Sequence, residues 1–160
     1  MYKFIFTFLL GFPLLAFGNA NRFWTFLKGT TPNNALELGM WSYHLNYTHP
    51  FKDVNYKGDL IAFSYKSLYL GTFRNSFYNR SYFVGIRRNL WQRHDKSWLL
   101  QAGYGLGIVS GYKDGQSMVI SKYSPIIPAA FGYFDVTYHH FGIELKTIID
   151  VFSIGFKIDL

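Results

Sequence analysis

Hydrophobic and polar residues alternate over short stretches from residue 37 to the end of the chain. The final stretch, FSIGFKIDL, has the clearest pattern, because polar or small residues separate Phe152, Ile154, Phe156, Ile158 and Leu160. A period of two is typical of a β-strand whose two faces meet different surroundings. No window of helical period interrupts this pattern, so we expect an all-β chain.

Turn residues divide this region into strands of about ten residues, the length that a tilted membrane-spanning strand needs. The predicted spans are 37–47, 58–66, 68–76, 81–90, 98–110, 125–134, 136–145 and 149–160. Strands with one apolar face and one polar or small face suit a wall between lipid and an interior. We therefore predict an eight-stranded antiparallel transmembrane β-barrel, whose narrow interior holds side chains or one small ligand.

The N-terminal residues 1–20, MYKFIFTFLLGFPLLAFGNA, carry one early cation, an apolar run and then small residues. This order is typical of a secretory signal peptide, and we expect cleavage after Ala20, which leaves residues 21–160 as the barrel domain. A membrane anchor is the alternative, but Gly11 and Pro13 interrupt the run, and a spanning helix needs roughly 20 apolar residues. The next stretch, NRFWTFLKGTTPNN, is either a short amphipathic helix at a membrane interface or a disordered leader.

The composition agrees with a membrane wall. Of the 160 residues, 49% are hydrophobic and 21% are aromatic, an unusual surplus for a small soluble fold. No segment after the N-terminus is apolar enough for a transmembrane helix, and the chain contains no cysteine for a disulfide framework. The net charge is +7 without a dense run of Lys and Arg, which favours anionic lipid headgroups or phosphorylated sugars over nucleic acid as partners.

A row of glycines raises the question of what the interior holds. The stretch WLLQAGYGLGIV places Gly103, Gly105 and Gly107 on one face of the fifth predicted strand. Glycine weakens a strand and marks close approach by another group. One interpretation is a slot for an extended hydrocarbon chain, supported by Gly85 and Gly155 in other strands. The alternative is a tight bend of the barrel, or a large neighbouring side chain that fills the space.

Candidate chemistry lies at the ends of the first and third predicted strands. If the mature N-terminus starts on the periplasmic side, His44 and the pair Asn75-Ser76 both lie at the external rim of a barrel small enough for them to meet. An imidazole beside a hydroxyl is the minimum for activating an oxygen that attacks an ester carbonyl. The alternative is a solvated or hydrogen-bonded surface histidine beside the polar tip of a hairpin.

Other polar and aromatic residues have weaker assignments. Phosphate binding by bidentate hydrogen bonds is one interpretation of Arg74, Arg80, Arg87 and Arg88, and a rim of charges that fixes the depth of the barrel is the other. Arg74 and Arg80 rank higher because they flank Ser76. His139 and His140 are expected to point to opposite faces of a strand, so together they cannot chelate a metal, and we predict neither a metal nor a cofactor. We interpret the four tryptophans as anchors in the aromatic girdle at the membrane interface: Trp24, Trp41, Trp91 and Trp98.

Four motifs, taken in order and spacing, resemble the lipid A palmitoyltransferases (the PagP-like outer-membrane acyltransferases). They are W-x-x-H-x-x-Y at Trp41, His44 and Tyr47, LYLGTFRNSF with Asn75-Ser76, LLQAGYGLGIVSGY, and SPIIPAAFGY with Pro125 and Pro128. The resemblance covers the chain from about Trp41 to Tyr133. The last strand also resembles the C-terminal signature of bacterial outer-membrane barrels.

The resemblance implies an eight-stranded outer-membrane barrel with an amphipathic N-terminal helix and an interior acyl pocket. It implies transfer of a palmitoyl chain from a glycerophospholipid to lipid A, with His44 as general base, Ser76 as the activated or stabilising hydroxyl and Asn75 as the orienting group. Pro125 and Pro128 resemble prolines that leave gaps in strand pairing through which lipid enters, since proline has no backbone N–H.

The chain departs from the family pattern at two places. The family has an aspartate where this chain has Asn75, which can orient a neighbour but cannot stabilise an imidazolium by charge. The proline expected shortly before the histidine is absent, and ALELGMWSYH offers only Gly39. The first departure questions the activity, and the second questions a second lipid gate.

We therefore expect a monomeric acyltransferase of the outer membrane of a Gram-negative bacterium, with a glycerophospholipid donor, a lipid A acceptor and no nucleic acid partner. The expected substrate contacts are Arg74, Arg80, Gly85, Gly103, Gly105, Gly107, Pro125 and Pro128. The alternatives are a non-catalytic outer-membrane barrel with a structural or surface-interaction role, a lipid A deacylase, and a soluble periplasmic barrel that binds an apolar ligand. A deacylase would carry its His and Ser close together on one strand, a pattern that we do not find.

Overall fold

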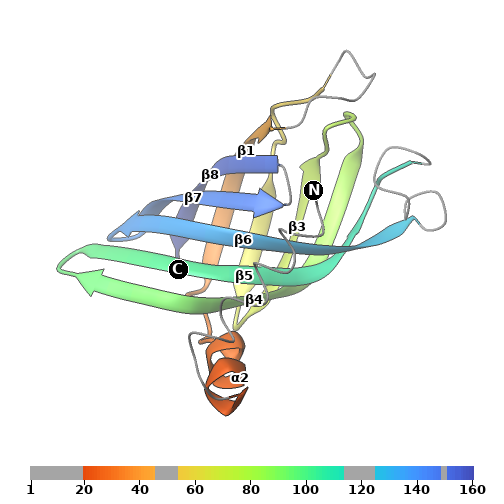
Figure 1. Cartoon of the computed structure of the whole chain (residues 1–160). Helices are drawn as coiled ribbons and strands as arrows, with labels where there is room; N and C mark the ends of the chain where they lie inside the picture. The colour runs from red at the N-terminus through yellow and green to blue at the C-terminus, as the bar shows by residue number, and fades with distance from the viewer. Residues whose placement is uncertain (1–19, 46–53, 114–124, 149–150) are drawn as a thin grey trace.

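The structure, a computed structural model, describes residues 20–45, 54–113, 125–148 and 151–160. Eight antiparallel strands follow one another round a closed barrel, and the last strand pairs with the first (Figure 1). The predicted all-β fold with eight antiparallel strands is therefore confirmed. The predicted signal peptide up to residue 19, and Tyr47 of the first motif, lie outside the described residues.

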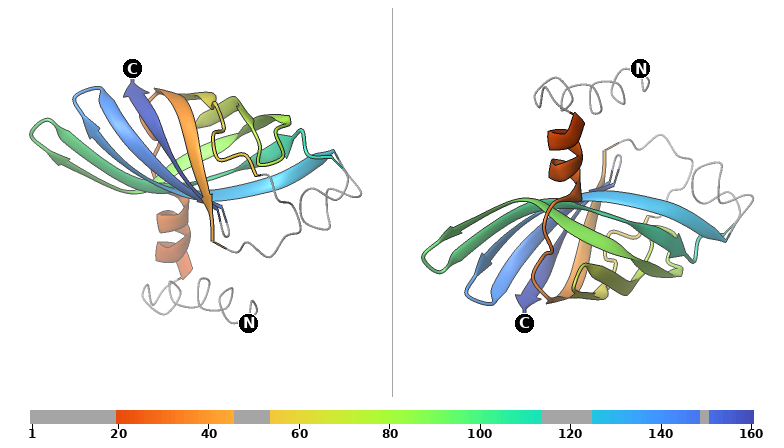
Figure 2. Two further views of the ribbon diagram at one scale, coloured as in Figure 1. Left: turned by 90° about the horizontal axis from the view of Figure 1, so that it is seen from above. Right: turned by 90° about the horizontal axis from the view of Figure 1, so that it is seen from below.

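The described elements begin with one helix, α2 (Ala20–Lys28), which lies outside the barrel (Figures 1 and 2). The strands are β1 (Ala35–His44), β2 (Ile61–Tyr65), β3 (Leu68–Arg74), β4 (Arg80–Asp95), β5 (Trp98–Ser110), β6 (Ile126–Tyr138), β7 (Phe141–Ile148) and β8 (Val151–Asp159). No helix in the described ranges is both long enough and apolar enough to cross a bilayer.

Side chains alternate between the interior and the outer wall, as the period of two predicts. On β8, Phe152, Ile154 and Phe156 are exposed on the wall, whereas Gly155 and Lys157 are buried inside. The same wall carries exposed apolar residues on the other strands, among them Leu68, Leu70, Val84, Ile86, Leu106, Ile108, Ile143 and Leu145. The hydrophobic surplus of the sequence therefore lies mainly on the outside of the barrel.

The connections between strands distinguish the two ends of the barrel. Two-residue turns join β2 to β3, β4 to β5 and β6 to β7, and we call this end the turn mouth. The other end, where β1, β3, β5 and β7 finish, we call the loop mouth. Residues with positive φ occur in all three tight turns, such as 45° at Lys66 and 52° at Lys96, and such turns match the twist of the flanking strands.

The structure corrects the predicted boundary between the sixth and seventh strands. The prediction placed it near residue 135, but β6 continues to Tyr138. His139 and His140 form the turn, with φ of 54° at His139, and therefore do not point to opposite faces of a strand. The error arose because this turn has no glycine, proline or asparagine to mark it.

A bulge in β1 decides which way His44 points. Between Leu38 and Trp41, β1 has one residue more than the facing part of β8. Gly39, with φ of 72°, supplies the left-handed conformation that such a bulge needs. The extra residue shifts the alternation by one position, so the even-numbered residues of β1, including His44, face the interior after the bulge.

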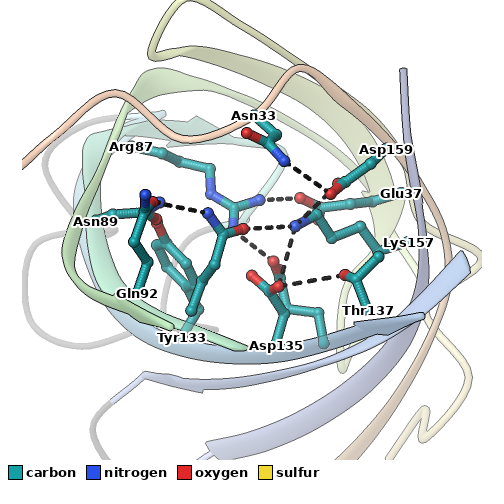
Figure 3. A network of polar contacts seen from close by, with 12 residues as sticks. Asn33, Glu37, Arg87, Asn89, Gln92, Tyr133, Asp135, Thr137, Lys157 and Asp159 are labelled. Atoms are coloured by element: carbon teal, nitrogen blue, oxygen red, sulfur yellow. Dashed lines mark hydrogen bonds and ion pairs between the residues drawn. The ribbon is translucent and has the colours of Figure 1, made fainter. Parts of the chain in front are cut away.

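Charged side chains fill the interior at the turn mouth (Figure 3). We call this set the ion network: Glu37, Arg87, Asp135, Glu144, Lys146, Lys157 and Asp159. Arg87 is ion-paired with both Glu37 and Glu144, and all three are almost fully buried. Lys157 Nζ lies 3.0 Å from carboxylate oxygens of both Asp135 and Asp159.

Aromatic rings cover the ion network on the side of the loop mouth. This aromatic layer consists of Tyr69, Phe83, Phe131 and Tyr133, whose ring centres lie 5.2 to 6.4 Å apart in consecutive contacts. The Arg87 guanidinium lies 4.0 Å from the centre of the Tyr133 ring, so the two groups also interact through the π face. The turn-mouth half of the interior is consequently filled by side chains.

Candidate active site

His44 and Ser76 meet at the loop mouth. Ser76 Oγ lies 3.0 Å from His44 Nε2, although the two residues are 32 positions apart in the sequence. His44 is the last residue of β1, and Ser76 follows the end of β3, with β2 between the two strands. The predicted meeting of these side chains is confirmed, and the distance is within the range in which a base takes a hydroxyl proton.

Asn75 holds the turn around Ser76 and uses its whole side chain to do so. Its Oδ1 accepts hydrogen bonds from the backbone N–H groups of Phe77 and Asn79, at 2.9 and 3.1 Å. Its Nδ2 donates to Ser81 Oγ and to the Gly111 carbonyl, both at 3.1 Å. Because all four hydrogen-bonding positions of the amide are occupied, Asn75 orients Ser76 through the backbone and not through a side-chain bond to His44.

Asn55 also contacts the backbone of Asn75 and Ser76, and the sequence did not predict this role. It is buried, and its backbone N–H donates to the Ser76 carbonyl at 2.9 Å. Its Nδ2 donates to the carbonyl of Asn75 at 3.1 Å, and more weakly to that of Arg74 at 3.4 Å. In the sequence, Asn55 is one polar residue of a polar loop, and only the folded arrangement identifies its partner.

The two arginines expected to bind substrate both lie at the loop mouth. Arg74 and Arg80 are Cα partners at the open end of the β3–β4 pair, and both are exposed. The Arg80 guanidinium makes two hydrogen bonds to the Asp59 carboxylate, at 2.7 and 3.2 Å. The exposed pair therefore forms part of a charged rim, and an anion at Arg80 would compete with Asp59.

The other two arginines have structural contacts. Arg87 belongs to the ion network. Arg88 points to the outside, where its Nε and Nη2 donate to the carbonyls of Lys28 and Gly29 at 2.6 and 2.9 Å. These carbonyls lie at the end of α2 and lack helical partners, so Arg88 caps the helix and attaches it to the wall.

The space beside the row of glycines is occupied. A Cβ at Gly105 would lie 2.2 Å from the Phe131 ring, and one at Gly103 would lie 2.6 Å from the Tyr133 hydroxyl. Gly85 and Gly107 face each other across β4 and β5, where a Cβ on either would meet the neighbouring backbone. A Cβ at Gly107 would also lie 2.9 Å from the Phe83 ring. The predicted slot is therefore filled at Gly103, Gly105 and Gly107, and the alternative interpretation, a large neighbouring side chain, applies to them.

The prolines lie beside a gap in strand pairing. β6 pairs with β5 from Ile126 to Tyr138, but with β7 only from Gly132 onward. Within the described ranges, residues 126–131 thus have a strand partner on one side only, and β6 continues past β7 in Figure 1. Pro128 lies in this stretch and Pro125 just before it. The expected gap is confirmed, whereas passage of lipid through it stays a prediction.

Within the described residues, the structure shows no gap in pairing on the β2 side of β1 before His44, where the missing proline put a second lipid gate in question. The segment from Asn55 to Leu60 lies against β1 through hydrogen bonds from Ser42 N to the Tyr56 carbonyl, from Gly58 N to the Met40 carbonyl and from Gly39 N to the Leu60 carbonyl, at 2.6 to 2.8 Å. These bonds continue the β1–β2 pairing toward the loop mouth. The absence of a proline before His44 agrees with this continued pairing.

No protein-family model matches this chain, and no curated protein matches it. Among the residues that the structure describes, no group of three or more His, Asp or Glu side chains could hold a metal ion. The arrangement at the loop mouth, a base within hydrogen-bonding distance of a hydroxyl, is suited to nucleophilic attack on an ester.

Proposed function

We propose that this protein is an outer-membrane lipid acyltransferase that moves a fatty acyl chain from a glycerophospholipid to lipid A. The observation that carries the proposal is the 3.0 Å contact between Ser76 Oγ and His44 Nε2 at the loop mouth. The resemblance to the lipid A palmitoyltransferases supplies the substrates, because the pair itself indicates only chemistry on an ester.

His44 acts as the general base in this proposal. Its Nε2 accepts a hydroxyl proton while the hydroxyl oxygen attacks the donor's ester carbonyl. The ester C–O bond then breaks, and the imidazolium returns the proton to the oxygen of the departing lysophospholipid. If Ser76 is the attacking hydroxyl, the chain is first held as a Ser76 ester, and a lipid A hydroxyl that gives its proton to His44 then attacks this ester and releases Ser76, which regains a proton from the imidazolium. If a lipid A hydroxyl attacks the donor directly, Ser76 keeps the imidazole in place. In both cases Asn75 holds the Ser76 turn.

The outer wall supports a membrane location. Exposed aromatic residues lie toward both ends of the strands, among them Tyr43 and Tyr82 near the loop mouth and Trp91, Trp98 and Tyr138 near the turn mouth. Apolar side chains separate the two sets, and this order is typical of a barrel in a bilayer. The gap beside Pro128 would give a lipid chain lateral access to the loop-mouth half of the interior.

The aromatic layer limits the space for a donor chain. From Phe131 to Ile127, β6 rises four residues toward the loop mouth, or about 13 Å at the usual strand rise. The inward positions on the mouth side of Phe131 are aliphatic or small at Val109, Ile127 and Ala129, whereas the Phe83 ring lies against Gly107. We expect the acyl chain to occupy this part of the interior, on the mouth side of Phe131, in place of the glycine slot.

A non-catalytic barrel is the second candidate, and the filled interior and the amide at Asn75 favour it. Mass spectrometry of lipid A from cells that make the protein distinguishes the two. We expect one added acyl chain with the natural protein and none with His44→Ala or Ser76→Ala, each produced as a folded barrel at the same level. No added mass, or equal addition by both variants, would favour the non-catalytic barrel.

A further inference from the structure

The segment from Asn55 to Asp59 connects the two strands that carry the candidate catalytic pair. On one side it bonds to β1 through Met40 and Ser42, with N···O distances of 2.6 and 2.8 Å. On the other side, Arg74 N donates to the Gly58 carbonyl at 2.6 Å and to Asp59 Oδ1 at 2.9 Å. We call these residues the bridging segment.

Gly58 allows this close fit. A Cβ at Gly58 would lie 2.1 Å from Met40 Cε and 3.3 Å from the Arg74 carbonyl oxygen. The bridging segment is therefore wedged between the strand of His44 and the end of β3. The space that this segment occupies between the two strands therefore helps to set the distance between the His44 imidazole and the Ser76 hydroxyl.

Asn55 links the bridging segment to Ser76 through its backbone N–H, which donates to the Ser76 carbonyl. Besides its bonds to the carbonyls of Ser76 and Asn75, its Oδ1 accepts the Lys57 N–H at 3.0 Å, which fixes the Asn55 side chain over its own turn. The side chain is thus held at both ends of its amide. A buried amide with this geometry cannot be exchanged for a carboxylate without placing negative charge against carbonyl oxygens.

We propose that Asn55 is a positioning residue of the active site: its side chain holds the Asn75 carbonyl, and this bond, together with the backbone bond from Asn55 to Ser76, keeps the Ser76 backbone at the distance that lets the hydroxyl reach His44 Nε2. The hydrogen bonds of Asn55 to Ser76 and Asn75 are present whatever reaction the protein catalyses. Only the expected effect on catalysis rests on the proposed function. A displacement of about 1 Å can lower a rate on the order of 100-fold. The bridging segment therefore acts on turnover, and not on the capture of the lipid.

The experiment compares the full-length natural protein with Asn55→Asp and Asn55→Ala, all refolded in detergent with ¹⁵N-labelled histidine. Both variants keep the backbone N–H that bonds to the Ser76 carbonyl and lose the Nδ2 donor to the Asn75 carbonyl, so they test the side chain alone. Asn55→Asp also keeps the acceptor for the Lys57 N–H. Ser76→Ala gives the imidazole signal without the hydroxyl, and His44→Gln assigns the signal. Asn33→Ala is the matched control, because Asn33 makes its side-chain bond to Asp159 at the opposite mouth, at 3.0 Å.

We expect both Asn55 variants to move the His44 ¹⁵N shifts toward those of Ser76→Ala, and to lower kcat at least about tenfold with KM within about twofold. Asn33→Ala should retain the natural shifts and kcat. If either Asn55 variant, folded by its heat-dependent gel mobility, retains both the natural His44 shifts and kcat, the proposal is wrong. If the shifts move but the natural protein transfers no acyl chain, the positioning role stands and the proposed function fails.

Discussion

At the scale of single residues, the site depends on the contact between His44 Nε2 and the Ser76 hydroxyl. The 3.0 Å contact with Ser76 Oγ suits the neutral tautomer with the proton on Nδ1, because the hydroxyl then donates to Nε2. The neighbouring Asn75 amide donates to a hydroxyl and a carbonyl and accepts from two backbone N–H groups. Of the two adjacent residues, Ser76 therefore contacts the proposed base, and Asn75 holds the turn.

Replacing Asn75 with aspartate, the residue of the palmitoyltransferases that the sequence resembles, tests these roles. In Asn75→Asp the carboxylate loses the hydrogen bond to the Gly111 carbonyl and faces that oxygen with like charge. We expect the free energy of unfolding to fall by about 1–3 kcal/mol and acyl transfer to stay at or below the natural level. Denaturant unfolding and the lipid A assay measure the two effects. A rise in activity would contradict the assignment of Asn75 as a residue that holds the turn.

At the scale of elements, the bulge at Gly39 determines the face on which His44 lies. Deleting Gly39 removes the extra residue and restores continuous alternation, so His44 would point to the outer wall. We expect the deletion variant to lose acyl transfer even if its heat-dependent gel mobility is that of a folded barrel. Gly39→Ala keeps the register at a cost of about 1–2 kcal/mol for the left-handed backbone, and should keep activity. Equal activity of the deletion variant and the natural protein would show that the bulge does not determine the position of His44.

The strands also show which features the sequence could predict and which it could not. The strands were predictable because alternation records which side chains face lipid and which face the interior, and it brought His44 and Ser76 to one rim. Alternation does not record the register between strands, so it could not predict that the Phe131 ring covers Gly105. Asn55 was missed for a related reason: its partners are backbone carbonyls on a distant strand, which no local pattern identifies.

At the scale of the whole molecule, the ion network closes the turn-mouth half of the barrel. In Arg87→Met, Lys146 remains as the partner of Glu37 and Glu144, and one buried positive charge is lost. We expect the free energy of unfolding to fall by about 3–5 kcal/mol. The matched variant Arg80→Met removes an exposed ion pair and should cost about 0–1 kcal/mol. Urea unfolding in detergent measures both, and equal losses would contradict a structural role for the buried network.

The aromatic layer, which rests on this network, should set the length of the acyl chain. Phe131→Ala removes the ring beside Gly105 and opens the interior toward the turn mouth. We expect the variant to accept longer chains than the natural protein, in a competition between phospholipids with chains of different length. Ala130→Val, on the outer wall, is the control. An unchanged length preference in a folded Phe131→Ala barrel would place the donor chain elsewhere.

The most direct test of acyl transfer uses the purified barrel in detergent, a phospholipid with one ¹³C-labelled acyl chain, and unlabelled lipid A. We predict that the labelled chain appears on lipid A, with one lysophospholipid formed for each chain transferred, and that His44→Ala abolishes both products. Label that stays in the phospholipid, or appears only as free fatty acid, would contradict this prediction.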